Sequence, residues 1–273
     1  MQKIVIGYNP AANMLPMFYF LDRSNPKLEF VNGVPAAHNR LMAEGKLDMA
    51  PISAFSFGQH WGKYSLLADL SVSAKGPFGS LLLFSKFELP ELDGRSVALT
   101  NTSASTVNML KIILDCFYHI KPVFKTMPPK LDAMLAEADA ALLIADEALA
   151  GLARNNNELL VYDVSQEWEK HTGLSMTFAV WAVSNSALEK FPAGVDYVHK
   201  LLLESKQKGL ANVDKIIDYC ITNLGHDPKF WSVYFSQLRY GLEPELLQGL
   251  NTYFRYCVDL GLLPSQPQIN IWP

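Results

Sequence analysis

A run of small, mostly polar residues, Thr100 to Thr106, carries the strongest chemical signal in the sequence. It follows a predicted strand, Arg95 to Leu99, and precedes a predicted helix, Val107 to Tyr118. Backbone N–H groups at a helix start, together with hydroxyls, bind anions. Ser103 or Ser105 alone would suffice as a helix cap, so the length of the run favours an anion site. The positions expected to contact the anion are Thr100, Ser103, Ala104, Ser105 and Thr106.

Two other predicted strand ends carry polar side chains. Ser53 follows the segment Met49 to Ile52, and Asn13 follows the first strand, Ile4 to Ile6. Each side chain could simply cap a helix, although Asn13 can also offer a ligand both a donor and an acceptor. Because the strand ends of α/β units converge on one cleft, we expect Asn13, Ser53 and the polar run to face one ligand.

Asp146 and Glu147 follow another predicted strand, Ala140 to Ile144. Asp146 could supply a carboxylate to the same cleft, but Asp at this position more often caps the following helix, here Glu147 to Arg154. We therefore expect Asp146 to be a cap at the edge of the substrate site, without a catalytic role.

Familiar catalytic and metal-binding patterns are missing. The six histidines show no HxxxH or HxH spacing, and the three cysteines form no CxxC pair. These spacings disfavour a metal site and a disulfide framework. GxSxG, Walker A and GxGxxG motifs are also absent. We expect neither a metal nor a cofactor.

Composition restricts the class of partner. The chain has 273 residues, of which 49% are hydrophobic and 18% are charged, with a net charge of −4 and no basic run. This balance is typical of a soluble globular protein and disfavours nucleic acid or an anionic membrane as a partner. The apolar stretches are too short to span a membrane, and the start does not resemble a signal peptide. We expect a cytoplasmic monomer or homodimer that binds a small molecule.

The order of the predicted elements indicates a two-lobed α/β fold. Strand-like and helical segments alternate as far as Ser184, and helices alone are expected beyond it. Two apolar strands, Gly79 to Ser85 and Met176 to Ser184, are expected to cross between the lobes. This order is typical of the type-two periplasmic-binding-protein-like fold, with a helical C-terminal segment. Lobe one would contain residues 1–85 and 185–273, and lobe two residues 86–184, with the ligand between them.

Short motifs in a fixed order extend this interpretation over nearly the whole chain. They include Asn13-x-Leu15-Pro16, Asn39-Arg40-Leu41, Pro51-Ile52-Ser53, Gly76-Pro77-x-Gly79-Ser80, Ser103-Ala104-Ser105-Thr106 and Asp146-x-Ala148-Leu149. With these motifs the sequence resembles the menaquinone-biosynthesis family of the futalosine route, and within it the chorismate dehydratases. Ala145 stands where that family usually has Gly.

The resemblance implies that the substrate is chorismate, a dianion, which loses water to give 3-enolpyruvylbenzoate. It adds Ser80 and Arg40 as expected substrate-binding positions and makes Asn13 the expected catalytic residue. Asn13 would fix the enolpyruvyl arm or the departing hydroxyl by hydrogen bonding. Because no convincing protein base is evident, the carboxylate of that arm is expected to remove the ring proton.

Three alternatives stay open. The sister enzyme makes dihydroxynaphthoate from a cyclic futalosine, and it is expected to carry a histidine just before the Asp146 helix, where this chain has none. A solute-binding protein for a small carboxylate would ordinarily carry a signal or lipid anchor. A regulatory ligand-binding domain would ordinarily carry a DNA-binding module. We recognise neither feature in the sequence.

Overall fold

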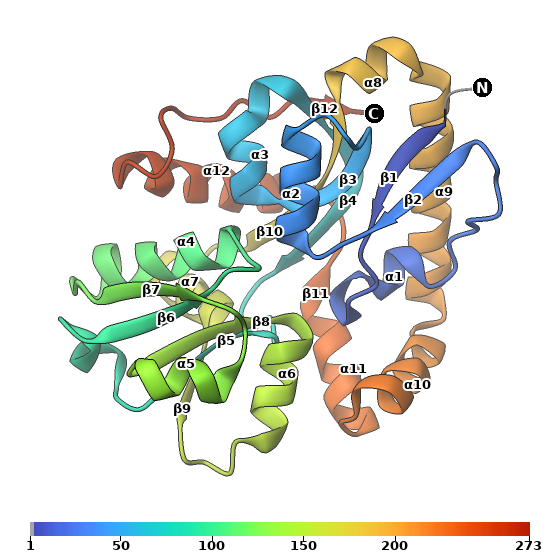
Figure 1. Cartoon of the computed structure of the whole chain (residues 1–273). Helices are drawn as coiled ribbons and strands as arrows, with labels where there is room; N and C mark the ends of the chain where they lie inside the picture. The colour runs from blue at the N-terminus through green and yellow to red at the C-terminus, as the bar shows by residue number, and fades with distance from the viewer. Residues whose placement is uncertain (1–2) are drawn as a thin grey trace.

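The computed structural model describes residues 3–273, which form two sheets with helices packed around them (Figure 1). The larger sheet has the strand order β11-β4-β10-β3-β1-β2, and β12 also pairs with β4. Its strands are β1 (Ile4–Tyr8), β2 (Leu28–Asn32), β3 (Met49–Ser53), β4 (Tyr64–Ala74), β10 (Met176–Ser184), β11 (Leu238–Arg239) and β12 (Ile271–Trp272).

The smaller sheet has the strand order β7-β6-β8-β5-β9. It forms the separate body at the lower left of Figure 1. Its strands are β5 (Leu81–Ser85), β6 (Ser96–Thr100), β7 (Val123–Met127), β8 (Ala140–Ile144) and β9 (Leu160–Asp163). The two α/β lobes expected from the sequence are therefore confirmed.

The helices cover both sheets. They are α1 (Leu15–Phe18), α2 (Pro35–Ala43), α3 (Ala54–His60), α4 (Ser105–Ile112), α5 (Leu131–Glu137), α6 (Ala145–Arg154), α7 (Val164–Thr172), α8 (Asn185–Lys190), α9 (Pro192–Ala211), α10 (Val213–Leu224), α11 (Pro228–Gln237) and α12 (Pro244–Asp259). Shorter turns are η1 (Ala12–Met14), η2 (Trp61–Lys63), η3 (Leu89–Leu92) and the π-helical turn η4 (Ile113–Phe117). Helix α12 packs against both β10 and α4, so the C-terminal segment contacts both lobes.

The two strands expected to cross between the lobes each belong to one sheet. Strand β5 lies between β8 and β9 in the smaller sheet, and β10 lies between β3 and β4 in the larger one. Both strands thereby pair their backbone groups on two sides, as buried N–H and C=O groups require. We propose that the lobe boundaries expected at residues 85 and 184 shift accordingly. We propose that the chain passes between the lobes in residues 75–80 and again in residues 173–175.

Strand β3 explains how lobe one delivers a side chain to the cleft. All five of its residues are buried, because β1 and β10 flank it and helices cover it. Such a strand is apolar throughout rather than alternating. Ser53 ends the strand and begins α3, so it marks the point where the chain leaves the sheet.

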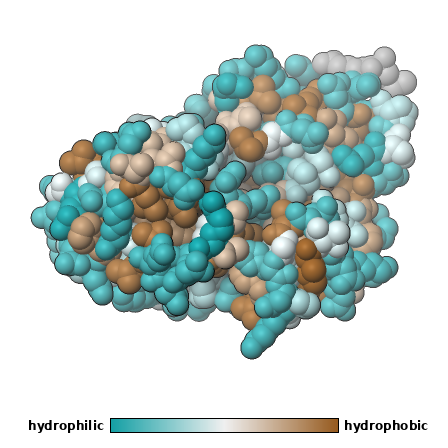
Figure 2. Space-filling model, turned by 60° about the horizontal axis from the view of Figure 1, so that its bottom comes forward, coloured by the Kyte–Doolittle hydropathy of each residue, from teal (hydrophilic) through white to brown (hydrophobic). Residues whose placement is uncertain are grey.

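The surface carries no broad apolar face in the view of Figure 2. Hydrophobic residues there form small separate patches among hydrophilic ones. Large exposed hydrophobic side chains come from separate parts of the chain, among them Tyr19, Val123, Leu160 and Val233, and scattered exposure of this kind is ordinary. Within residues 3–273, none of the helices combines the length and the apolar character that a membrane crossing requires.

Candidate functional site

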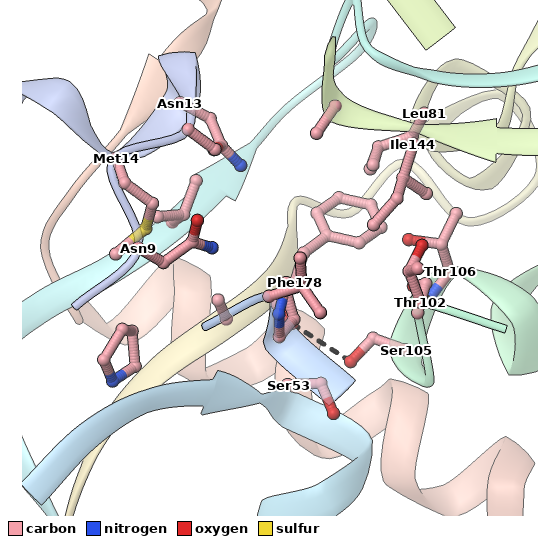
Figure 3. Close-up of a pocket in the computed structure, with 18 of the residues that line it drawn as sticks. Asn9, Asn13, Met14, Ser53, Leu81, Thr102, Ser105, Thr106, Ile144 and Phe178 are labelled. Carbon is pink, nitrogen blue, oxygen red and sulfur yellow. Dashed lines mark hydrogen bonds between the residues drawn. The ribbon is translucent and has the colours of Figure 1, made fainter. Parts of the chain in front are cut away.

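A cleft of about 390 Å³ lies between the two lobes, within the size range of small-molecule sites. Lobe one lines it with the β1–η1 loop, the end of β3 and the middle of β10. Lobe two lines it with the loop before α4 and the first turn of α6. Figure 3 shows Asn9 and Asn13 on one side and Thr102 and Thr106 on the other, with Phe178 between them.

The start of α4 forms the polar wall of lobe two. Ser103 and Thr106 both line the cleft, and only 2% of Thr106 is exposed. The Ser103 Oγ accepts a hydrogen bond from the backbone N–H of Thr106 at 3.3 Å. Ser103 lies one residue before Ala104, the N-cap of α4, and its side chain both accepts a first-turn N–H and lines the cleft. Thr102 lines the cleft as well, although it was not among the expected contacts.

The hydroxyl of Ser105 makes hydrogen bonds between the two lobes. Its Oγ accepts a hydrogen bond from the backbone N–H of Phe55 and donates one to the carbonyl of Phe178, both at 3.0 Å. Phe55 and Phe178 belong to lobe one, whereas Ser105 begins α4 in lobe two. Because a hydroxyl has one proton to donate, the Ser105 side chain has none left for a ligand. Ser105 lines the cleft, as expected, and its hydroxyl also connects the two lobes.

Ser53 is held so that its proton remains available. Its Oγ accepts from the backbone N–H of Ser56 at 3.1 Å and from the Asn39 side-chain amide at 3.0 Å. The Asn39 side-chain oxygen in turn accepts from the Ser53 N–H at 2.9 Å. With both acceptor sites of the hydroxyl used, its O–H can donate toward the cleft, which Ser53 lines. Asn39 belongs to the motif Asn39-Arg40-Leu41, but no role for its side chain was predicted from the sequence.

Asn13 lies in η1 and lines the cleft, as expected. Asn9 lines the same side of the cleft (Figure 3) and was missed. Both amides come from the loop after β1, where the chain leaves the larger sheet. The only signal in the sequence was a second amide residue close to Asn13.

Asp146 lines the cleft and does not cap its helix. The N-cap of α6 is Ile144, which makes no side-chain capping bond, and Ala145 has φ of +52°. This left-handed turn, rare for residues other than Gly, begins the helix one residue before Asp146. The expected capping role is therefore wrong. The left-handed φ also accounts for the preference for Gly at position 145 that the family resemblance indicated.

The surroundings of Asp146 raise the pKa of its carboxyl above the usual value for Asp. Solvent reaches the side chain through the cleft, but the protein around it removes enough water to raise the pKa of the carboxyl. A hydrogen bond from the backbone N–H of Ala12 lowers this pKa, and the negative charge of Glu147 raises it. Ala12 belongs to η1 of lobe one, which packs against α6 of lobe two.

Four expected contacts lie outside the cleft lining. Thr100 is 1% exposed, and its Oγ1 lies 2.7 Å from Thr102 Oγ1. Ser80 is fully buried with its Oγ 2.9 Å from the hydroxyl of Tyr234. Arg40 leaves 71% of its side chain exposed beside Glu44, and Ala104 provides only the backbone cap of α4. The hydroxyls of Thr100 and Ser80 meet other hydroxyls inside the protein, and the guanidinium of Arg40 is exposed to solvent.

The charges in the cleft are all negative. Asp146 and Glu147 are the ionisable residues among the described residues that line it, and none of these is Lys, Arg or His. In the same part of the chain, residues 3–273, no three His, Cys, Asp or Glu side chains gather in a way that could hold a metal ion. An anionic ligand would therefore be held by hydroxyls, amides and backbone N–H groups.

Two α/β lobes with a ligand-sized cleft between them define a protein of the periplasmic-binding-protein-like class. Solved structures support this class. An alkanesulfonate-binding protein from Xanthomonas axonopodis pv. citri, bound to MOPS, superposes with a TM-score of 0.71 at 15% identity, covering 100% of this chain and 98% of that one. The chain belongs to the menaquinone biosynthesis family, whose model matches residues 4–259.

Two further relatives are similar over nearly their whole length. A chorismate dehydratase from Thermus thermophilus is 29% identical over 267 residues, which cover 93% of this chain and 94% of that protein. The crystal structure of a protein from Archaeoglobus fulgidus has a TM-score of 0.78 at 20% identity, covering 96% of this chain and 98% of that one. The likeness to the solved structures shows the fold, and the family match adds menaquinone biosynthesis.

Proposed function

We propose that this protein is a chorismate dehydratase, a lyase that converts chorismate into 3-enolpyruvylbenzoate and water. The observation that carries the proposal is the likeness to the Thermus thermophilus chorismate dehydratase, which leaves neither lobe uncovered. The cleft supports it, because its polar groups come from both lobes and its size suits one small molecule. Incubation of the purified protein with chorismate tests the proposal.

The substrate carboxylates are assigned to the neutral donors of the cleft. Ser103 and Thr106 would contact the ring carboxylate, and Ser53 would donate its free O–H from the opposite lobe. Each hydrogen bond to a charged group contributes about 1.5–3 kcal/mol. Asn13, on the far side of the cleft, would fix the enolpyruvyl arm or the departing hydroxyl.

Formation of an aromatic ring supplies the driving force of the reaction. The protein then has to orient the arm and exclude water. The enolpyruvyl carboxylate of chorismate is the proposed base, because the Ser, Thr and Asn side chains of the cleft have no useful basicity at neutral pH. Chorismate amidated at this carboxylate should still bind, but it should react far more slowly than chorismate. A normal rate with the amide would show that the protein supplies the base.

Two alternatives make different predictions in the same assay. A protein that only binds a small carboxylate would return chorismate unchanged, and a cyclic-futalosine enzyme would convert the futalosine but not chorismate. We propose a cytoplasmic location as well, since Cys116, Cys220 and Cys257 are all free thiols. Whether the protein is a monomer or a homodimer stays a prediction for sedimentation or light scattering.

A further inference from the structure

Asp146 is held in place from both lobes, next to the residue proposed to bind the reacting arm. The first turn of α6 packs against η1, and the N–H of Ala12, the neighbour of Asn13, lies close enough to the Asp146 carboxyl to lower its pKa. On the other side, the N–H of Ala145 donates to the carbonyl of Ser80 at 2.8 Å and fixes the left-handed turn before Asp146. Strained backbone at a non-Gly residue is often found at functional sites.

The titratable groups that face Asp146 are a carboxyl, a thiol and a phenol, and none of them is a cation. Glu147 follows it on α6, and Cys220 of α10 and Tyr234 of α11 are close enough for its charge to act on them. Burial raises the pKa of Cys220 to about 12 and also raises that of Tyr234, so both are neutral at neutral pH. A dianion placed in a cleft without a cation among its described lining residues adds further negative charge, which favours protonation of Asp146.

The proposed reaction needs such a proton, because hydroxide is a poor leaving group. The hydroxyls and amides of the cleft can hydrogen-bond to the departing oxygen but do not give up a proton at neutral pH. Resting on the proposed function, we propose that Asp146 is the catalytic acid that protonates the departing hydroxyl of chorismate. The lack of a cation among the described lining residues fits this role, because the negative charge of the bound substrate raises the pKa of Asp146.

The step balances without a further reactant. The enolpyruvyl carboxylate takes the ring proton, and the electron pair of that C–H bond forms the new ring double bond. The C–O bond breaks, its electron pair stays on the oxygen, and the proton of Asp146 completes a water molecule. Asp146 is left as a carboxylate, and the proton on the enolpyruvyl carboxyl returns to Asp146 or to solvent.

A substrate with a different leaving group separates this role from a structural one. In a chorismate analogue that carries fluoride in place of the ring hydroxyl, the leaving group needs no proton, and the organic product is the same. Asp146→Asn should lose about 10²–10⁴-fold in single-turnover rate on chorismate and keep a rate near that of the unmodified protein on the fluoride. Asp132→Asn is the control, because Asp132 lies on α5 with 86% of its side chain exposed.

Proton uptake gives a second measurement that does not depend on turnover. Calorimetric titration with the dianionic product in buffers of different ionisation enthalpy should show proton uptake by the unmodified protein and a clear reduction in Asp146→Asn. An equal loss of rate on both substrates, or no loss on chorismate, would overturn the acid role. So would unchanged proton uptake in the variant. If the unmodified protein converts neither substrate, the proposed function is wrong as well. If it converts both but the Asp146→Asn results above do not appear, only the acid role is wrong.

Discussion

The Oγ of Ser105 accepts a hydrogen bond from the backbone N–H of Phe55 at 3.0 Å and thereby joins the first turn of α4 to the first turn of α3. The carbonyl of Ser105 also accepts from the hydroxyl of Tyr253, a fully buried residue of α12, at 3.2 Å. The lobes are thus connected beside the cleft by side-chain hydrogen bonds as well as by the chain itself. Ser105, a residue of the cleft lining, therefore also holds the two walls of the cleft together.

Replacing Ser105 tests this connection. Ser105→Ala leaves the buried N–H of Phe55 without its partner, which should lower the free energy of unfolding by about 2 kcal/mol. Denaturant unfolding followed by circular dichroism measures the loss. Ser236→Ala on the exposed side of α11 should change stability little. A Ser105→Ala protein as stable as Ser236→Ala would contradict the structural role.

The anion contacts are tested by a double replacement. Ser103→Ala with Thr106→Ala should weaken binding of chorismate or its product at least tenfold, since ~1.4 kcal/mol corresponds to a factor of ten and each lost bond to a charged group exceeds that. Arg40→Ala should bind as the unmodified protein does, because its side chain is exposed outside the cleft. Calorimetric titration measures both. Equal affinity of all three proteins would place the anion elsewhere.

Asn13→Asp should severely reduce activity. The substitution keeps the shape of the side chain but removes a donor, and it places a negative charge beside a dianion, in a cleft that already contains Asp146 and Glu147. We expect a loss of at least a hundredfold in single-turnover rate with the fold unchanged by circular dichroism. Asn13→Ala is the matched control, since it removes the donor without adding charge and should lose less. Full activity of Asn13→Asp would remove Asn13 from the mechanism.

Ala145→Gly should stabilise the protein. A left-handed conformation costs a non-Gly residue about 1–2 kcal/mol, and the added freedom of Gly in the unfolded chain returns about 0.4–1 kcal/mol of that. A net gain of about 0.5–1 kcal/mol is expected from thermal or denaturant unfolding. Ala150→Gly, on the exposed side of the same helix, should instead cost about 1 kcal/mol. Destabilisation by both substitutions would contradict the strained turn.

The sequence predicted most elements where the local pattern was regular. Strand β8 has the predicted bounds, Ala140 to Ile144. Strand β4 was not predicted, because polar residues interrupt its apolar pattern, Asp69 within it has φ of +56°, and its pairing with β10 shifts register. The sheet that each of β5 and β10 joins depends on long-range pairing, which no local pattern records.

The same distinction holds for the site. Strand-to-helix turns in the sequence predicted that five residues would reach one cleft, and all of them line it: Asn13, Ser53, Ser103, Ser105 and Thr106. Side-chain partners far away in the chain could not be predicted in this way. Ser80 meets Tyr234 across 154 positions and Ser105 meets Phe55 across 50. Asp146 was taken for a cap because the left-handed turn at Ala145 depends on the three-dimensional fold.

Conversion of chorismate by the purified protein, followed over time by mass spectrometry, tests the dehydratase assignment. Chorismate should disappear as 3-enolpyruvylbenzoate, lighter by one water molecule, appears in equal amount without any added cofactor. Asn13→Asp, measured in parallel, should convert chorismate far more slowly and thereby exclude a contaminating enzyme. Recovery of unchanged chorismate from a folded protein that binds it would contradict the dehydratase assignment and favour a protein that only binds its ligand.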